Sequence, residues 1–221
     1  MKITDLTHAI LSDMPVYPGT EQPAFINANT LEKDGFKETK ITMYSHTGTH
    51  IDAPSHLLRD GLSLDRLDAG HFIGSALVLD FTNEDKKTIG VERLKPWEEK
   101  IKNVEFILIN TGWSKYWGSE KYFEAFPSLS EEAAQWLSAF NLKGIGIDAI
   151  SIDAMMSAAL TVHKIFLRKN IIIIENLTNL TSIGSEYFIL SILPLKYGNA
   201  DGSPVRAISI ENTVQWQADT E

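Results

Sequence analysis

The sequence contains no cysteine, is poor in basic residues and lacks a long apolar run, and each absence excludes a class of protein. Without cysteine the chain forms no disulfide and offers no thiolate to a metal, so a metal would have to bind histidine, aspartate or glutamate. The 20 basic residues face 29 acidic ones, which argues against a nucleic-acid partner, because such partners normally require a basic surface. The most apolar stretches, 171–174 and 188–195, are far shorter than the ~20 residues that span a bilayer.

The length and composition are those of a folded protein. The chain has 221 residues, of which 43% are hydrophobic and 22% charged, whereas disordered chains are more polar. No repeat, low-complexity segment or Pro/Gly/Ser-rich linker divides it, so we expect a single domain over residues 1–221. The first residues place Asp5 and Asp13 before any long apolar run and do not resemble a signal peptide. We therefore expect a cytoplasmic protein without a membrane partner.

Hydrophobic patterning predicts an α/β protein with a mixed sheet. Runs rich in β-branched and aromatic residues predict strands over residues 2–11, 37–44, 75–81, 104–110, 144–147, 171–174, 187–193 and 206–210. Helices are expected over residues 91–102, with Pro96 at a start or kink, and over 130–140 and 160–168. Ser128 and Glu131 have the spacing of a capping box before the second helix. Strands 144–147 and 171–174 with a helix between them predict a βαβ unit with parallel neighbours.

Histidines are concentrated in one short segment, HTGTHIDAPSH. It holds three of the six histidines of the chain, His46, His50 and His56, together with Asp52. Imidazole and carboxylate groups suit zinc, manganese or iron at neutral pH. The alternative is a set of hydrogen-bonded histidines near a turn, which this density makes the weaker interpretation. A closed structural zinc site is also disfavoured, because such sites rely on cysteine.

The segment before this cluster has the pattern of a strand, which suggests how the ligands are arranged. Alternate residues of a strand share a face, so His46, His50 and Asp52 would project to one side if the strand continues. Gly48 also falls on that side and would leave space for an ion. A proline then ends the strand and places His56 on the loop just beyond.

Two further candidates lie downstream. His163 opens the third predicted helix, and Glu175 follows four consecutive isoleucines. A carboxylate at the end of a buried parallel strand is where α/β proteins place ligands, although a glutamate emerging into solvent is the alternative. For Asp148 and Asp153, in GIDAISID, we expect turn or supporting roles.

These motifs carry a family resemblance. HTGTHIDAPSH, GIDAISID and the histidine–glutamate pair leading into IIIIENLTNL resemble the cyclase family of metal-dependent hydrolases, which includes bacterial kynurenine formamidases and isatin hydrolases. The match begins at LTHAILSDMPVYPG and covers most of the chain. The resemblance implies a swivelling β/β/α fold with a barrel-like β portion, and a homo-oligomer, dimer or tetramer. It also implies two divalent ions per subunit, zinc first and manganese as the alternative.

The resemblance also assigns roles to individual residues. It implies five metal ligands, in chain order His46, His50, Asp52, His163 and Glu175. Asp52 would bridge the two ions and Glu175 would reach both, while His56 matches the proton donor and acceptor of the family. Tyr17 stands where the formamidases commonly carry a tryptophan against the substrate, so it is the candidate substrate-binding residue. Packing in a rigid turn between two prolines is its alternative role.

The leading hypothesis is a metal-dependent hydrolase that cleaves a C–N amide bond of a small molecule, an arylformamide or a cyclic amide. Metal-activated water would attack the carbonyl, and His56 would move the proton. The alternatives are a kynurenine formamidase proper and a non-catalytic metal- or ligand-binding member of the fold. A third alternative is an interaction protein that uses an aromatic patch of Trp113, Tyr116, Trp117, Tyr122 and Phe123. A core edge, a pocket lid or a subunit contact is the favoured role for these residues.

Overall fold

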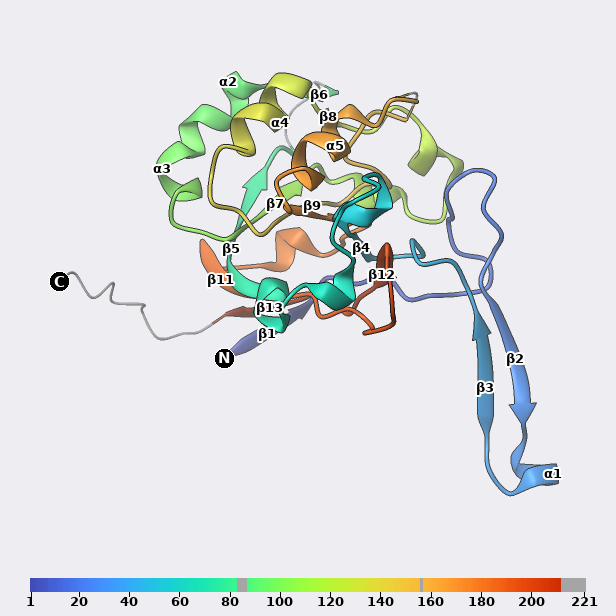
Figure 1. The fold of residues 1–221 in the computed structure, drawn as a ribbon. Helices are drawn as coiled ribbons and strands as arrows, with labels where there is room; N and C mark the ends of the chain where they lie inside the picture. The colour runs from blue at the N-terminus through green and yellow to red at the C-terminus, as the bar shows by residue number, and fades with distance from the viewer. Residues whose placement is uncertain (83–86, 156, 212–221) are drawn as a thin grey trace.

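The short apolar runs of the sequence form one curled, half-barrel sheet in the computed structural model, which describes residues 1–82, 87–155 and 157–211. The nine strands follow the order β1-β13-β11-β5-β7-β9-β10-β4-β12 (Figure 1). In that order their bounds are Lys2–Asp5, Ile208–Glu211, Tyr187–Ser191, Ile73–Asp80, Phe106–Asn110, Gly144–Ile147, Ile172–Glu175, His50–Asp52 and Gly202–Pro204. No helix in these ranges is long and apolar enough to cross a membrane.

The centre of the sheet is parallel and its flanks are antiparallel. Strands β5, β7, β9 and β10 run parallel, and every residue of β7 and β10 is buried, as expected for strands covered on both faces. The predicted βαβ unit is confirmed, because β9 and β10 are parallel neighbours joined through helix α5 (Thr161–Leu167). On the far side of β10, strands β4 and β12 add in antiparallel fashion. The expected mixed sheet and cyclase-like half-barrel are therefore present.

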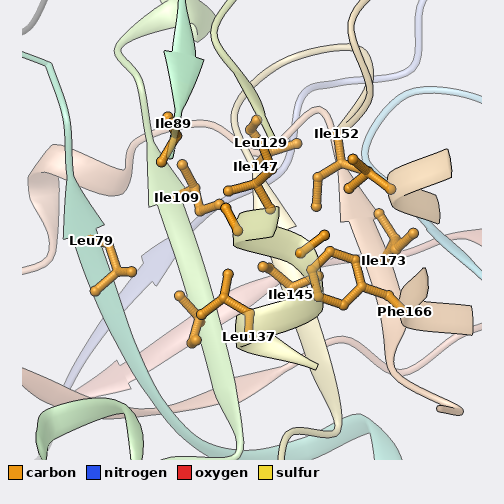
Figure 2. Close-up of a cluster of buried hydrophobic side chains, with 14 of the residues drawn as sticks. Leu79, Ile89, Ile109, Leu129, Leu137, Ile145, Ile147, Ile152, Phe166 and Ile173 are labelled. Carbon is orange, nitrogen blue, oxygen red and sulfur yellow. The ribbon is translucent and has the colours of Figure 1, made fainter. Parts of the chain in front are cut away.

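Helices cover one face of the sheet over the larger of two apolar clusters. Helix α4 (Glu131–Leu137) and α5 pack there, and Figure 2 shows Leu137 and Phe166 reaching toward Ile145 and Ile173 on the strands. All four side chains are essentially inaccessible to water. Full burial of side chains of this size stabilises the fold by about 1.5–3 kcal/mol each.

The helix predicted over residues 91–102 is interrupted at its proline. The segment divides into α2 (Val91–Leu94), the 3-10 turn η4 (Lys95–Trp97) and α3 (Glu98–Ile101), which confirms the expected kink at Pro96. The remaining 3-10 turns are η1 (Pro54–His56), η2 (Leu64–Arg66), η3 (Ala69–Phe72), η5 (Trp113–Tyr116), η6 (Glu120–Phe123) and η7 (Leu180–Ser182).

The predicted capping box is wrong by two residues. Ser128 lies in the short strand β8 (Ser128–Leu129), which pairs with β6 (Thr88–Ile89). The N-cap of α4 is Ser130, whose side chain accepts a hydrogen bond from the backbone N–H of Ala133. Both serines precede a glutamate-rich turn, so the spacing motif alone did not identify the true cap.

The N-terminal region departs most from expectation. Strand β1 ends at Asp5 rather than continuing to residue 11, and β3 (Glu38–Thr42) stops before the histidine cluster. Strand β2 (Ala24–Asn29), which the sequence did not predict, pairs with β3, and the helical turn α1 (Leu31–Asp34) connects them. The resulting hairpin projects away from the rest of the molecule (Figure 1).

Candidate metal centre and active site

The pairing of β4 with β10 brings three of the expected site residues onto one face of the sheet. In the antiparallel register Glu175 lies directly opposite His50, and directly opposite residues share a face. Asp52 is two residues beyond His50 and therefore projects to the same side. All three are buried, and this places carboxylates beside an imidazole at the carboxyl end of β10.

His163 reaches the same cluster from helix α5. One oxygen of each carboxylate faces each histidine: His50 Nε2 is 3.3 Å from Asp52 Oδ1 and 3.6 Å from Glu175 Oε2. His163 Nε2 is 3.4 Å from Asp52 Oδ2 and 3.2 Å from Glu175 Oε1. Ligand atoms at 2.0–2.2 Å from a common tetrahedral ion lie roughly 3.3–3.6 Å from one another. Each of the two carboxylates therefore faces both histidines, with a different oxygen toward each, at spacings that suit ligands of a shared ion.

The second nitrogen of each of these rings is already occupied. His50 Nδ1 donates to the backbone carbonyl of Gly48 at 2.8 Å, and His163 Nδ1 donates to Asp153 Oδ2 at 2.6 Å. With Nδ1 held in these bonds, Nε2 is the nitrogen of each ring that faces the carboxylates. Histidines that bind metals typically donate their other ring N–H in this way. The donor set therefore fits the binding of divalent metal.

Asp153 has the supporting role expected of it. Besides His163 Nδ1, its carboxylate accepts the backbone N–H groups of Val162 and His163 at 3.1 and 2.9 Å, at the start of α5. Burial raises the pKa of Asp153, but these hydrogen bonds and the charge of His163 outweigh it and lower that pKa overall. Asp153 therefore both stabilises the start of α5 and orients His163. Asp148 instead accepts hydrogen bonds from the N–H and hydroxyl of Thr111.

His46 lies at the site on a turn, whereas the sequence predicted it on a strand. Strand β3 has ended and residue 46 lies on a turn, in which Gly48 adopts a φ of +65°. This left-handed conformation favours glycine, so Gly48 shapes the turn rather than leaving space in a strand. The expectation that His46 shares a strand face with His50 and Asp52 is therefore wrong, although its Nδ1 still lies 2.7 Å from Asp52 Oδ1.

The rim of the site carries Asp201, which sequence analysis missed. Asp201 precedes β12, and its Oδ2 lies 3.2 Å from His46 Nε2 and 3.9 Å from His56 Nδ1. The following glycine, Gly202, packs against the His46 ring so closely that a Cβ there would lie 2.5 Å from His46 Cε1. No local pattern around Asp201 indicates this role, because the contact forms only when β12 pairs with β4.

His56 lies in the 3-10 turn just beyond β4, as expected. Its ring centroid is 4.1 Å from that of His46, and 28% of its side chain is exposed. One ligand atom from each of His46, Asp52 and His56 falls within a 4.8 Å group. His56 thus faces the ligand cluster from its open side.

The carboxylates of the cluster are stabilised by positive charge nearby. Burial would raise the pKa of Asp52, but the neighbouring histidines outweigh it and hold that pKa well below its ordinary value. Burial likewise opposes protonation of His46, yet Asp52 and Asp201 raise the pKa of His46 to about 9. Asp153, Asp52 and Glu175 raise the pKa of His163 in the same manner. Buried carboxylates this close together are stable only beside cations.

A buried hydrogen-bond chain holds the turn in place. Asn176 Nδ2 donates to the Gly48 carbonyl at 2.8 Å, and Tyr122 donates its hydroxyl to Asn176 Oδ1 at 2.7 Å. Tyr122 is fully buried, and Trp113, Trp117 and the other aromatics of the proposed patch pack partly buried against the core. These aromatics form a core edge, which is one of the roles expected for them.

The ligand cluster forms the floor of a cavity of about 410 Å³, within the size range of small-molecule sites. All six predicted metal and acid–base residues line it. Tyr17, the candidate substrate-binding residue, lies in the wall with 49% of its surface exposed. Val16, Ile150 and Leu160 add apolar surface that sequence analysis did not assign to the site. The cavity can therefore hold a small, partly apolar molecule over the carboxylates.

The fold and site together define an α/β protein with a histidine–carboxylate centre at the carboxyl end of a sheet strand. Residues 4–154 match the family described as putative cyclase, and the chain belongs to this family. Kynurenine formamidase from Bacillus cytotoxicus is 33% identical over 205 residues, which cover 92% of this chain and 95% of that protein.

Solved structures agree with this assignment. Isatin hydrolase A from Labrenzia aggregata, bound to benzyl benzoate, has a TM-score of 0.85 at 27% identity, with 94% of this chain and 93% of that chain covered. A structure described as a potential metal-dependent hydrolase with cyclase activity has a TM-score of 0.78, also at 27% identity, with coverages of 94% and 96%. The recognition of a cyclase-family metal-dependent hydrolase from the sequence is thereby confirmed.

Proposed function

We propose that the chain hydrolyses a C–N amide bond in a small molecule, with His46, His50, Asp52, His163 and Glu175 holding two divalent ions. The observation that carries the proposal is the arrangement of Asp52 and Glu175, each with one oxygen near His50 and the other near His163. Zinc suits this donor set best and manganese is the alternative. Ions bound there would lower the pKa of water from ~15.7 toward ~7 and polarise a carbonyl.

His56 is the proton carrier in this proposal. Burial lowers the pKa of His56, with the charges of Asp52 and Asp201 opposing and those of His46 and His163 adding to the shift. The ring is therefore neutral at pH 7 and able to accept a proton from water. It would then return that proton to the leaving nitrogen, with Asp201 beside its Nδ1.

The substrate class follows from the relatives and the cavity. Kynurenine formamidase and isatin hydrolase names refer to an aryl formamide and a cyclic aryl amide. The cavity of about 410 Å³ accommodates an aryl ring of that size, with Tyr17 placed to stack on it. Kynurenine formamidase proper is the narrower alternative. We further propose a cytoplasmic location and a homo-oligomer, dimer or tetramer.

The first experiment measures hydrolysis of N-formylkynurenine and of isatin by the purified protein, before and after chelation, with metal content determined in parallel. We expect about two ions per chain and turnover of at least one substrate that is lost on chelation and restored by zinc or manganese. Asp60→Asn, at an exposed aspartate away from the cavity, serves as the mutational control for Asp52→Asn. Metal-free protein with chelator-resistant turnover would contradict the proposal.

A non-catalytic binding protein gives a different result. Such a protein would contain the ions but hydrolyse neither substrate, nor other small amides and lactams. His56→Ala separates the cases further, because in an enzyme it lowers turnover about 10²–10⁴-fold while the ions remain.

A further inference from the structure

The charged side chains that line the cavity are of one kind, apart from the histidines. Asp52 and Glu175 lie at its floor and Asp201 at its rim. Among the described residues of the lining, none is a lysine or an arginine. A carboxylate on a bound molecule is usually held by one of these two residue types, often through paired hydrogen bonds. The cavity therefore offers no such partner to a negatively charged part of a substrate.

The carboxylates of the floor and of the rim differ in how accessible they are. Asp52 and Glu175 are exposed by 2% and 7% of their side chains, and each faces two histidines of the ligand cluster. Asp201 is exposed by 46% of its side chain. Aspartate has an ordinary pKa near 4 and is ionised at neutral pH. Asp201 therefore presents a negative charge to a molecule that enters the cavity.

The neighbours of Asp201 leave this charge available. In the part of the chain that the structure describes, its ion-pair contacts are both with histidines. His46 lies 3.2 Å from Asp201 Oδ2 and, as a metal ligand, would be a neutral imidazole. His56 Nδ1 is 3.9 Å away, beyond hydrogen-bond reach. A cation on a bound molecule can therefore pair with Asp201.

Two tyrosines line the cavity together with Asp201. Tyr17 and Tyr44 are exposed by 49% and 52%. Tyr44 lies two residues before His46, so it enters the lining from the same stretch of chain as the histidine that contacts Asp201. The face of an aromatic ring attracts cations. Accessible aromatic rings and an ionised carboxylate are the groups that recognise an organic ammonium ion.

The floor of the cavity has the opposite polarity in the proposed function. The divalent ions held there would more than offset the charges of the two carboxylates that bind them. The cavity is then positive at its floor and negative at its rim. A substrate matches both ends when its amide carbonyl oxygen points to the floor and a positive charge lies at the end remote from the amide.

We propose that the substrate is a small aryl amide with an ammonium group remote from the scissile bond, and that Asp201 pairs with this ammonium. The proposal rests on the proposed function and deepens it, because it names the substrate class of the same site. Asp201 is then a specificity-determining residue. A substrate with a carboxylate in place of the ammonium would be disfavoured, because it meets Asp201 and finds no lysine or arginine in the described lining.

The test uses three formanilides that differ only in the end of a short side chain at the meta position of the ring. The side chains are aminoethyl, propyl and carboxymethyl, in which saturated carbons separate the charge from the ring and keep the reactivity of the amide similar. With metal-loaded protein at pH 7 and low salt, kcat/KM should be about tenfold higher for the ammonium compound than for the propyl compound. The carboxylate compound should be the slowest. Equal values for the first two, or a fastest carboxylate, would overturn the proposal.

Asp201→Asn assigns the preference to this residue. The ratio of kcat/KM between the ammonium and propyl compounds should fall from about tenfold toward one. Because the ratio is taken within one protein, a change in overall turnover cancels. Asp60→Asn removes the same charge from an exposed position outside the cavity and should keep the wild-type ratio. A preference that survives in Asp201→Asn, or is lost equally in Asp60→Asn, would contradict the assignment.

Binding measurements separate failure of this proposal from failure of the proposed function. If metal-loaded protein hydrolyses none of the three amides, the function fails for aryl formamides, and calorimetry then compares the affinities of the ammonium and propyl compounds. Tighter binding of the ammonium compound that is lost in Asp201→Asn would leave the recognition of the cation standing. Equal binding, or binding of neither compound, would refute it. Metal content and melting curves for each variant show that the proteins compared are loaded and folded.

Discussion

The two sides of the candidate site are built differently. His50, Asp52, His163 and Glu175 come from strands and a helix, and no more than 7% of any of their side chains is exposed. His46, His56 and Asp201 come from turns, and 23%, 28% and 46% of their side chains are exposed. Buried groups with all hydrogen bonds made hold a fixed geometry, whereas exposed groups on turns can adjust. In the proposed function the buried side supplies four of the five metal ligands, and the open side supplies His46 and the acid–base group His56.

The largest effect is expected from removing the carboxylate that both histidines of the buried side share. Asp52→Ala takes ligand atoms from both ion positions at once. We expect loss of both ions and a fall in turnover beyond ~10⁴-fold, because ion-activated water is no longer available. Metal analysis by mass spectrometry and single-turnover assays measure this. Full metal occupancy in Asp52→Ala would show that the two histidines do not share the carboxylate.

His56→Ala tests the open side. Turnover should fall about 10²–10⁴-fold, the usual contribution of a positioned acid–base group, with the ion content unchanged. A loss of ions would instead make His56 a ligand, as its place in the group with His46 and Asp52 allows. The pH–rate profile of the wild type adds a second readout. Since the pKa of His56 is lowered, the active neutral form should persist below pH 6.5, and the rate should decline only at more acidic pH.

Matched aspartate-to-asparagine changes sharpen the comparison. Asp153→Asn weakens the acceptor that orients His163, so metal affinity should fall about 10–100-fold. A chelator competition measures that affinity. An Asp153→Asn protein with wild-type affinity would show that the helix fixes His163 without help.

Asp201→Asn, the same chemical change on the open side, should behave differently. Metal affinity should change less than in Asp153→Asn. Removing the negative charge also removes an influence that raises the pKa of His56. The acidic limb of the pH–rate profile should therefore move to lower pH. A shift toward higher pH would contradict the assigned neighbourhood of His56.

The smallest effect is expected at His8, which does not line the cavity. Burial lowers the pKa of His8 to about 4, and its ring stacks on Trp117 at 3.9 Å. A histidine that is neutral in the folded state gives its full stability above its ordinary pKa of about 6.5 and loses it as the pH falls toward 4. Because His8 is partly exposed, the loss should be about 1–2 kcal/mol. The free energy of unfolding, measured with urea across that pH range, should depend less steeply on pH in His8→Phe than in the wild type. An unchanged pH dependence would show that it arises from other groups.

The sequence predicted which residues form the site better than it predicted the backbone geometry around them. HTGTHIDAPSH identified four residues of the cavity because metal-binding side chains are dense there, and the end of the isoleucine run placed Glu175 correctly. The explanation for His46 failed because alternation assumes a continuous strand, whereas the chain turns at Gly48 with a φ of +65°. Asp201 was missed because its approach depends on β12 pairing with a strand distant in sequence.

The hairpin of β2 and β3 was missed for a related reason. Strand β2 reads AFINAN, in which asparagine and alanine give little β signal and no alternation marks a buried face. Its pairing partner β3 was predicted, but too long, because the aromatic Tyr44 extends the strand-like pattern toward the cluster. A strand outside the core is detected only where its residues have high β propensity, as in β3, and β2 has few such residues.

The hydrogen bonds from Tyr122 through Asn176 to the Gly48 carbonyl have a consequence for how the protein would exchange its ions. That carbonyl accepts a hydrogen bond from His50 Nδ1 and so orients the ring, and Asp153 orients His163 in the same way. Hydrogen bonds within the protein therefore fix the directions of the His50 and His163 rings before an ion would bind. An ion held there, as proposed, would then be loaded and removed through the cavity while the sheet stays folded.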